Sequence, residues 1–362
     1  MRVLVTGHNG YIGSVMVDVL ARAGHDVVGV DTYLYEDCTF GEERIAVPAL
    51  RTDVRDLEVS ALSGFDAVIH LAALSDHPHG KVDPQITADV NHHASVRLAR
   101  LAREAGVKRF LFASSCSLYS GSAHGALLTE EAEFNPATRS AESKLLVEQS
   151  VSLLATGRFT PVFLRTAMAY GASPRLRTDL VVNSLVASAF TTGEMLIYSD
   201  GSQWRPFVHV EDISRAFAAV LQAPQHLVHN RAFNVGRTSE NYRIRDVAEI
   251  VREVLGGTRV TYAPGAGPEP TCYRVDFDEL AWSIPAFKPR WTVREGVREL
   301  YEAFSRDGLT CDRIAGPGSR YVRLQHLHRL RSRGLLDDQI RWTSFPGHLG
   351  APSSASPHLR TS

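Results

Sequence analysis

The sequence predicts an α/β fold, a doubly wound parallel sheet followed by a smaller C-terminal α+β substrate domain. Up to about residue 170, short apolar runs alternate with longer segments of helical periodicity. This order produces a parallel sheet with right-handed crossovers and helices on both faces. Beyond residue 173 the elements become shorter and less regular, as expected of a region that binds a ligand beside the sheet.

The N-terminus carries the most informative stretch. An apolar run at residues 2–5 leads into a turn with Gly7, Gly10 and Gly13, and a helical pattern follows. Glycine at these positions permits a sharp turn, leaves room for a pyrophosphate, and lets the helix pack closely on the strand. The helix N-terminus then faces the phosphates with free N–H groups and the positive end of its dipole. The stretch predicts a dinucleotide site of the Rossmann type.

A second apolar run, at residues 26–30, ends at Asp31. This acid lies about 20 residues after the glycines, where a carboxylate binds the adenosine ribose. Because it would repel a 2′-phosphate, the predicted cofactor is NAD rather than NADP. Strand, turn, helix, second strand and terminal acid occur in the order that the motif requires, which disfavours a coincidental match.

Composition and charge exclude other classes of protein. The 362 residues are 44% apolar with a formal net charge of -1, so the chain can bury a large core and has no electrostatic reason to bind nucleic acid or an acidic membrane. We find no membrane span of roughly 18 apolar residues and no signal-peptide pattern, and expect a cytoplasmic protein with a small-molecule partner. The four cysteines are scattered singly, which predicts reduced residues without a zinc site or a disulfide.

The remaining elements follow from periodicity and from helix and turn signals. Strands are expected at residues 67–73, 109–119, 159–165, 195–198, 205–210, 233–236 and 260–262, and residues 45–47 are expected to form the third strand or its approach. Helices are expected at residues 89–105, 136–155, 180–191, 211–221, 244–255 and 321–333. His70, inside a buried strand, is interpreted as a core histidine. His77 and His79 fall in the loop that follows it.

We divide the chain into four parts. Residues 1–172 form the main part of the NAD-binding domain, and residues 173–310 form most of the substrate domain with some return to the first. Residues 311–346 are a helical extension, and residues 347–362 are a tail rich in Ser, Pro and Thr that we expect to be disordered.

These motifs resemble a known family, the extended short-chain dehydrogenase/reductases, and within them the NAD-dependent nucleotide-sugar epimerases and dehydratases. The matching pieces cover roughly residues 1–300 and are residues 6–13, 31, 53–54, 70–73, 114–119, 143–144, 164–165 and 205–213. The resemblance implies that bound NAD briefly oxidises a sugar carbon, which permits inversion, elimination or reduction from the other face. It also implies a homodimer formed through the helices at residues 89–105 and 136–155.

The resemblance also implies roles for individual residues. Ser115 would hydrogen-bond the reacting hydroxyl, and Lys144 would hold the nicotinamide ribose. The expected cofactor-binding residues are Gly7, Gly10, Tyr11, Ile12, Gly13, Asp31, Thr32, Asp53, Val54, Leu71, Ala72, Ala73, Ser114 and Lys144. The expected substrate-binding residues are Ser75, Asp76, Ser115, Thr166, Asn183, Arg205 and Arg274.

The sequence departs from the family at the general base. The family carries a tyrosine four residues before the lysine, with its pKa lowered by the ammonium group, and here that position is Ser140. A serine hydroxyl is too weak an acid and too short to replace it. Another group or a water must carry the proton, or hydride chemistry is lost. The first candidate to replace the tyrosine as proton carrier is Tyr119, with a role in packing alone as the alternative for this residue. Weaker candidates are Glu142, Lys144, His77 and His79.

Two further departures concern the substrate. The family's 4,6-dehydratases carry an Asp-Glu pair where this chain has Cys116 and Ser117, which disfavours the ordinary dehydratase mechanism. Similar relatives carry an arginine near Thr271 that pairs with the nucleotide diphosphate. A dehydratase or oxidoreductase acting on a nucleoside or an unusual sugar therefore stays open. So does a protein that binds NAD or a sugar without catalysis.

Overall fold

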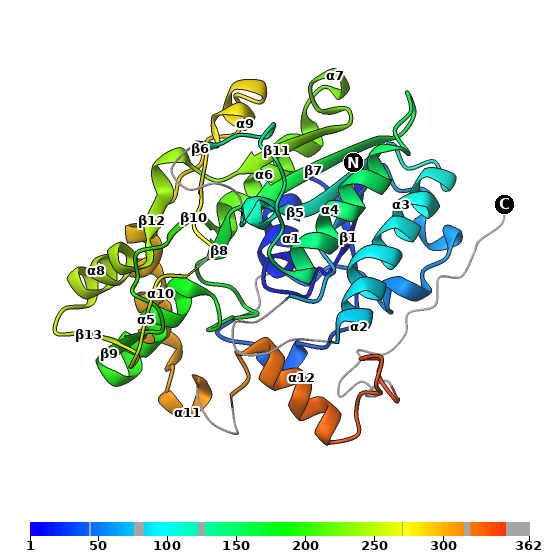
Figure 1. Ribbon diagram of the computed structural model, residues 1–362. Coiled ribbons are helices and arrows are strands. Elements are labelled where there is room, and N and C mark those ends of the chain that lie inside the picture. The colour runs from blue at the N-terminus through cyan, green and yellow to red at the C-terminus, as the bar shows by residue number, and fades with distance from the viewer. Residues whose placement is uncertain (43–44, 76–82, 122–126, 270, 315–318, 345–362) are drawn as a thin grey trace.

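The computed structural model describes residues 1–42, 45–75, 83–121, 127–269, 271–314 and 319–344 (Figure 1). In this part of the chain, parallel strands form a main sheet. They are β1 (Arg2–Thr6), β2 (Asp26–Asp31), β3 (Ala49–Arg51), β4 (Ala67–His70), β5 (Arg109–Ser115), β7 (Thr160–Thr166) and β11 (Arg231–Val235). Their order across the sheet is β11-β7-β5-β4-β1-β2-β3. The predicted doubly wound parallel sheet is confirmed.

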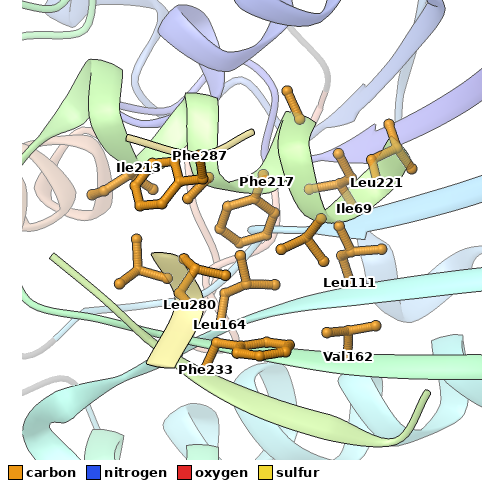
Figure 2. Close-up of a cluster of buried hydrophobic side chains, with 14 of the residues drawn as sticks. Ile69, Leu111, Val162, Leu164, Ile213, Phe217, Leu221, Phe233, Leu280 and Phe287 are labelled. Atoms are coloured by element: carbon orange, nitrogen blue, oxygen red, sulfur yellow. The ribbon is translucent and has the colours of Figure 1, made fainter. Parts of the chain in front are cut away.

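Helices cover both faces of the main sheet. One face packs against α1 (Gly13–Arg22), α6 (Val210–Gln222) and α9 (Asp278–Ser283). The other packs against α3 (Ala94–Glu104) and α4 (Arg139–Ser152), with α2 (Pro84–Ala88) and a π-helical turn (Asp89–His93) before them. On the first face, Phe217 of α6 lies among Ile69, Leu111 and Leu164 of three neighbouring strands (Figure 2). This apolar layer fixes the strands whose ends carry the site.

The later chain forms a second region beside the carboxyl edge of the sheet (Figure 1). Its strands are β6 (Leu127–Leu128), β8 (Met168–Tyr170), β9 (Glu194–Ile197), β10 (Trp204–His209), β12 (Asn241–Arg243), β13 (Arg259–Tyr262) and β14 (Arg274–Val275). Its helices are α5 (Val181–Thr192), α8 (Ile244–Leu255), α10 (Val293–Asp307) and α11 (Cys311–Ile314). The short helix α7 (Gln225–Val228) packs on the main sheet, and α12 (Arg323–Ser332) packs on the loops that follow β2 and β4. Val186, Val251 and Val297 place α5, α8 and α10 around one apolar cluster.

Residues 45–47, predicted as the third strand or its approach, form the approach to the strand. The strand in this part of the chain is β3, and it begins one residue after Pro48. Proline has no N–H to give to a ladder, so it stands where a strand starts. The Pro48 carbonyl accepts a bond of 2.8 Å from the Gly29 N–H, and the pairing with β2 continues from there. Val47 is apolar because it packs against the core.

The described helices include none that is long and apolar enough to span a bilayer. All four cysteines are free thiols. Cys38 and Cys116 are buried, whereas Cys311 is exposed.

Candidate functional site at the carboxyl edge of the main sheet

The turn after β1 has the geometry that its glycines predict. Gly7 adopts φ +73°, a conformation that residues with a side chain rarely take, and its N–H donates to the Val30 carbonyl at 2.8 Å. A Cβ atom at Gly7 would lie 2.8 Å from the backbone nitrogen of Ala72, and one at Gly13 would collide with the Gly7 carbonyl oxygen. The turn therefore lies against the end of β4, with bare backbone facing outward.

Helix α1 begins directly at this turn. Within the described residues, no side chain caps its first turn at Ile12, so backbone N–H groups remain for an anionic ligand. Tyr11 does not present its side chain to that position. It is 6% exposed, and its hydroxyl donates to the Gly171 carbonyl at 2.7 Å, which joins the turn to the second region. The contribution of Tyr11 to phosphate binding is therefore limited to its backbone.

Asp31 ends β2 beside this turn. Its two carboxylate oxygens accept bonds from the backbone N–H groups of Asn9 at 3.0 Å and Tyr33 at 2.8 Å. A cavity of about 140 Å³ adjoins this position and is lined in part by His8, Asn9 and Tyr33. His8 Nδ1 and Asn9 Nδ2 are buried there without a hydrogen-bond partner among the described residues. A carboxylate beside polar atoms without partners fits the hydroxyl-rich ribose of a dinucleotide.

Four more of the residues expected to bind the cofactor lie at this carboxyl edge of the sheet. Thr32 follows β2, and Leu71 and Ala72 follow β4, two strands apart in the sheet. Asp53 stands just past β3 and caps the short 3-10 turn Val54–Asp56. Its carboxylate is held by both the backbone and the guanidinium of Arg55, which lowers the pKa of Asp53. The glycine turn, Asp31 and this edge thus form one continuous surface that fits NAD.

Lys144 reaches the carboxyl edge of the main sheet from α4, on the face opposite to α1. Thr138 caps α4 through a bond of 3.2 Å from the Ala141 N–H, and Lys144 follows in the second turn of the helix. Its ammonium donates to the Ala113 carbonyl on β5 and lies 5.2 Å from the centre of the Phe112 ring. Burial lowers the pKa of Lys144 to about 8. The side chain therefore exists as a mixture of ammonium and neutral amine near neutral pH.

The hydroxyl residues expected at the reacting centre follow Ala113 on the same strand. Ser115 ends β5 and pairs in register with Thr166 at the end of β7. The Ser115 hydroxyl accepts a bond of 3.1 Å from the Ser117 N–H, which leaves its own hydrogen free to donate. Ser114 points to the other face, where its hydroxyl donates to Glu148 of α4. Ser115 and Thr166 are therefore neighbours at the ends of two adjacent strands. Lys144 reaches β5 at Ala113, two residues before Ser115, and Ser140 lies one helical turn before Lys144.

Tyr119 does not fit the role of proton carrier that we predicted for it. Its side chain is completely buried, and its hydroxyl donates to Asn234 Oδ1 at 3.1 Å and accepts from Arg165 at 2.8 Å. Burial raises the pKa of Tyr119, which opposes loss of its proton. The alternative prediction, that this tyrosine only packs, agrees with its position.

Two other candidates have partners within the protein. Glu142 is on the exposed side of α4, where it pairs with Arg139 at 2.6 Å. Asn183 is fully buried, and its amide binds the backbone of Gly171 and Arg177. A substrate role for Asn183 stays a prediction. Ser75 is exposed, whereas Asp76, His77 and His79 lie outside the described residues.

His70 is a core residue, as predicted. Its two ring nitrogens bond the hydroxyls of Thr6 at 2.6 Å and Ser95 at 2.7 Å. Burial lowers the pKa of His70 to about 3, so the ring stays neutral at physiological pH.

The two arginines expected to bind substrate lie in the second region. Arg205 ends up next to Glu269, with 2.7 Å between the guanidinium and the carboxylate, and it also bonds Thr271. Arg274 lies over the Trp204 ring, with its guanidinium carbon 5.2 Å from the ring centre. Arg205 is therefore already paired with an acid at the position where we expected a diphosphate.

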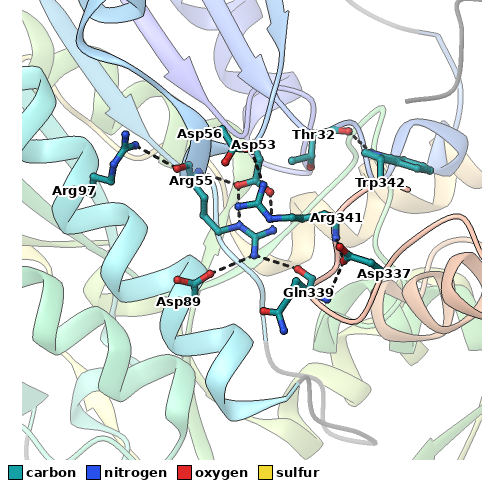
Figure 3. Close-up of polar contacts among 10 residues, drawn as sticks. All are labelled: Thr32, Asp53, Arg55, Asp56, Asp89, Arg97, Asp337, Gln339, Arg341 and Trp342. Carbon is teal, nitrogen blue, oxygen red and sulfur yellow. Dashed lines mark hydrogen bonds and ion pairs between the residues drawn. The ribbon is translucent and has the colours of Figure 1, made fainter. Parts of the chain in front are cut away.

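Sequence reasoning missed two contributors to the site. His8 lies inside the glycine turn and packs edge-on against Tyr33 at a centroid distance of 5.4 Å. Residues 321–342 lie against the loops after β2 and β3 (Figure 3). Trp342, a lone tryptophan in a polar tail, was the signal that this tail folds back on the protein.

The fold and the site define a Rossmann-type α/β protein that binds NAD at the carboxyl edge of its sheet. Residues 3–236 match the NAD dependent epimerase/dehydratase family, and the chain belongs to this family. The UDP-glucose 4-epimerase of Mycolicibacterium smegmatis is 28% identical over 326 residues, which is 84% of this chain and 98% of that one. UDP-glucuronic acid decarboxylase 1 of Arabidopsis thaliana is 26% identical over 87% of this chain and 72% of its own.

Solved structures show the same similarity. MoeE5 in complex with UDP-glucuronic acid and NAD is 28% identical with a TM-score of 0.73, covering 84% of this chain and 99% of MoeE5. The UDP-glucose 4-epimerase of Thermus thermophilus in complex with NAD is 25% identical with a TM-score of 0.70, again covering 84% of this chain and 99% of that one. This chain thus carries residues beyond the length of both neighbours.

Proposed function

We propose that this protein is an NAD-dependent epimerase or dehydratase that transiently oxidises a sugar carbon of a nucleotide sugar. The observation that carries the proposal is the convergence of the glycine turn, Asp31, Lys144 and Ser115 on one edge of the main sheet. Bound NAD would supply the hydride acceptor for oxidation and the donor for reduction. Family membership and relatives that act on UDP-sugars support the choice of substrate.

We assign the proton transfer to Lys144. The resemblance places Ser140 where the family has its general-base tyrosine, and Tyr119 and Glu142 are committed elsewhere. A neutral Lys144 amine keeps one N–H for the Ala113 carbonyl and has a lone pair to accept a proton. Its pKa of about 8 makes that neutral form accessible near pH 7. Ser115, two residues beyond Ala113 on β5, would orient the reacting hydroxyl and pass on its proton.

The direct test is single-turnover incubation of the purified protein with a panel of UDP-sugars and nucleosides. NADH absorbance that rises and then decays, together with a stereoisomer or a product lighter by one water, supports the proposal. Stoichiometric NAD with no spectral change and no product across the panel contradicts it. That result would favour a protein that binds NAD without catalysis.

A second candidate function rests on Arg205. Its pairing with Glu269 means that a diphosphate must displace a carboxylate to bind there. A nucleoside or a free sugar needs no such displacement, so a dehydratase or oxidoreductase on one of these is the alternative. Glu269→Gln separates the two, because it should raise the affinity for a UDP-sugar and leave the affinity for a nucleoside unchanged.

We further propose that two copies associate through α3 and α4. Leu146 of α4 and Leu153, the residue that follows its last turn, are 38% and 84% exposed and lie about two helical turns apart. Exposed leucines in such a row are typical of an interface. Light scattering should give a dimer for the wild type and a monomer for Leu153→Glu. A monomeric wild type would contradict this assembly.

A further inference from the structure

The C-terminal strap, defined here as residues 321–342, crosses the adenosine half of the site. Trp342 donates its indole N–H to the Thr32 carbonyl at 2.7 Å (Figure 3). Thr32 directly follows Asp31, the acid that fits the ribose. The strap therefore contacts the cofactor site at Thr32, next to the Asp31 carboxylate.

A second set of bonds joins the strap to the turn after β3. Arg55, which holds the Asp53 carboxylate, also donates to the Gln339 carbonyl at 3.1 Å. Arg341 forms an ion pair with Asp56 on the same turn. The strap thus binds two adjacent residues of the turn that Asp53, an expected cofactor-binding residue, caps.

Apolar packing holds the strap in place on a third loop. Leu327 and Leu330 of α12, with Leu336 and Ile340 after it, pack against residues that follow β2 and β4 and precede α3. The residues on that side are Leu34, Leu74, Ile86 and Val90. His326 is 1% exposed and bonds the Leu34 carbonyl at 2.8 Å. Side chains this buried show that the strap is an integral part of the fold.

The end of the strap is shaped to present Trp342. Leu336 and Trp342 pair as an antiparallel bridge across a tight turn. The Asp337 carboxylate accepts from the N–H groups of Gln339 and Arg341, both at 2.8 Å, and closes that turn. The Asp337 carboxylate thus takes the place of a backbone carbonyl as the hydrogen-bond acceptor of the turn, as Asp and Asn side chains commonly do in loops.

We propose that the C-terminal strap closes the adenosine end of the NAD site and slows release of the cofactor. The three loops that it ties together follow β2, β3 and β4, the strands whose ends bind adenosine. An enzyme that oxidises and then reduces one substrate must keep the same cofactor between the two steps, so slow release serves the function proposed above, on which this inference rests.

The experiment measures the dissociation of radiolabelled NAD from the purified full-length protein after dilution into excess unlabelled NAD. Trp342→Ala removes the ring and the bond to Thr32, and Trp342→Phe removes only the bond. The matched control is Trp282→Ala, because Trp282 is 75% exposed on α9, away from the strap. We expect Trp342→Ala to release NAD roughly tenfold or more faster than wild type, Trp342→Phe to be intermediate, and the control to be unchanged.

A second measurement guards against misfolding of the variants. Hydrogen exchange of wild-type amides at residues 321–342 should slow when NAD is added, which needs no mutation. Release rates equal to wild type, slower release from Trp342→Ala, or exchange that NAD leaves unchanged would each overturn the inference. Tight binding of NAD without any turnover would instead overturn only the proposed reaction, and a wild type that binds no NAD would overturn both.

Discussion

Glu148 binds Arg165 with both carboxylate oxygens in the core, one helical turn beyond Lys144. The Nε and Nη2 atoms of the guanidinium lie 3.1 and 2.7 Å from the carboxylate, and both side chains are at most 7% exposed. The guanidinium also reaches Tyr119 and the Glu130 carbonyl. This cluster fixes α4 on β7 and so fixes the helix that carries Lys144.

Replacing Glu148 should destabilise the protein strongly. Glu148→Gln leaves the Arg165 charge buried without a counter-ion, and we expect a loss of about 3–5 kcal/mol in the free energy of unfolding. Denaturant unfolding at pH 7 measures it. The matched control is Glu249→Gln on α8, where the pair with Arg252 is half exposed, and it should not change the midpoint measurably. Equal midpoints for the two variants would show that the buried pair contributes nothing.

The rate of the oxidation step should rise with pH through about 8. Lys144 must be neutral to accept a proton, and burial lowers its pKa to about 8, so the active fraction grows as pH increases through that value. Lys144→Arg keeps the positive charge but stays protonated, and we expect a loss of about 10²–10⁴-fold in rate with NAD still bound. Single-turnover absorbance from pH 6 to pH 9.5 checks both. A rate that falls above pH 8 would show that the ammonium form is the working one.

Ser140→Tyr is expected to lower turnover. If Lys144 carries the proton, a phenol one turn away on the same helix competes for its lone pair and fills space at the reacting centre. We expect the rate to fall by roughly tenfold or more, with stability unchanged within about 0.5 kcal/mol. A rise in rate would show that the site is merely impaired by the absence of the tyrosine. Ser140→Ala controls for loss of the hydroxyl alone.

Gly13→Ala should abolish retention of NAD. The added methyl group would collide with the Gly7 carbonyl oxygen, so the turn must open and its N–H groups move. Gly157→Ala is the matched control, because a Cβ atom there meets no described atom within 4 Å. Cofactor content after purification, measured by mass spectrometry, gives the answer. NAD at full occupancy in Gly13→Ala would contradict the fit of this turn to the pyrophosphate.

Acid should weaken the fold through His70. Its pKa is about 3 in the native state against an ordinary value of 6.5, so between these values the unfolded chain binds a proton that the folded chain does not. Stability from this group is complete above pH 6.5 and is lost as pH falls, at a slope of about 1.4 kcal/mol per unit. His70→Gln should lower the slope of unfolding free energy against pH between pH 6.5 and pH 4 by about one proton.

Local patterns predicted the parts of the molecule that local physics determines. The glycine turn, Asp31 and α8 followed from glycine spacing and from periodicity, which act over a few residues. Whether Val47 belonged to the third strand or to its approach stayed open, because Val47 is apolar for packing rather than for pairing. The periodicity of apolar residues indicates which side chains are buried. Burial alone does not show whether the backbone forms hydrogen bonds with a neighbouring strand.

Roles that depend on distant partners could not be predicted in this way. Whether Tyr119 carries a proton or only packs stayed open, because its position along the chain follows the hydroxyl strand, whereas Asn234, 115 residues later, bonds its hydroxyl in the core. The contact between Trp342 and Thr32 spans 310 residues. No short stretch of sequence contains both partners of such a pair. The sequence therefore predicted the helix at residues 321–333 but not where it packs.

The position of β11 has a consequence for how the protein can be made and divided. This strand covers the edge of β7, yet it is synthesised only after β8, β9 and β10 of the second region. Until residue 235 leaves the ribosome, β7 is a bare hydrophobic edge open to pairing with other chains. A fragment that ends near residue 172 would keep that edge permanently. The NAD-binding half is therefore not a separable module, and a gene cut at this boundary should yield aggregates rather than a small cofactor-binding protein.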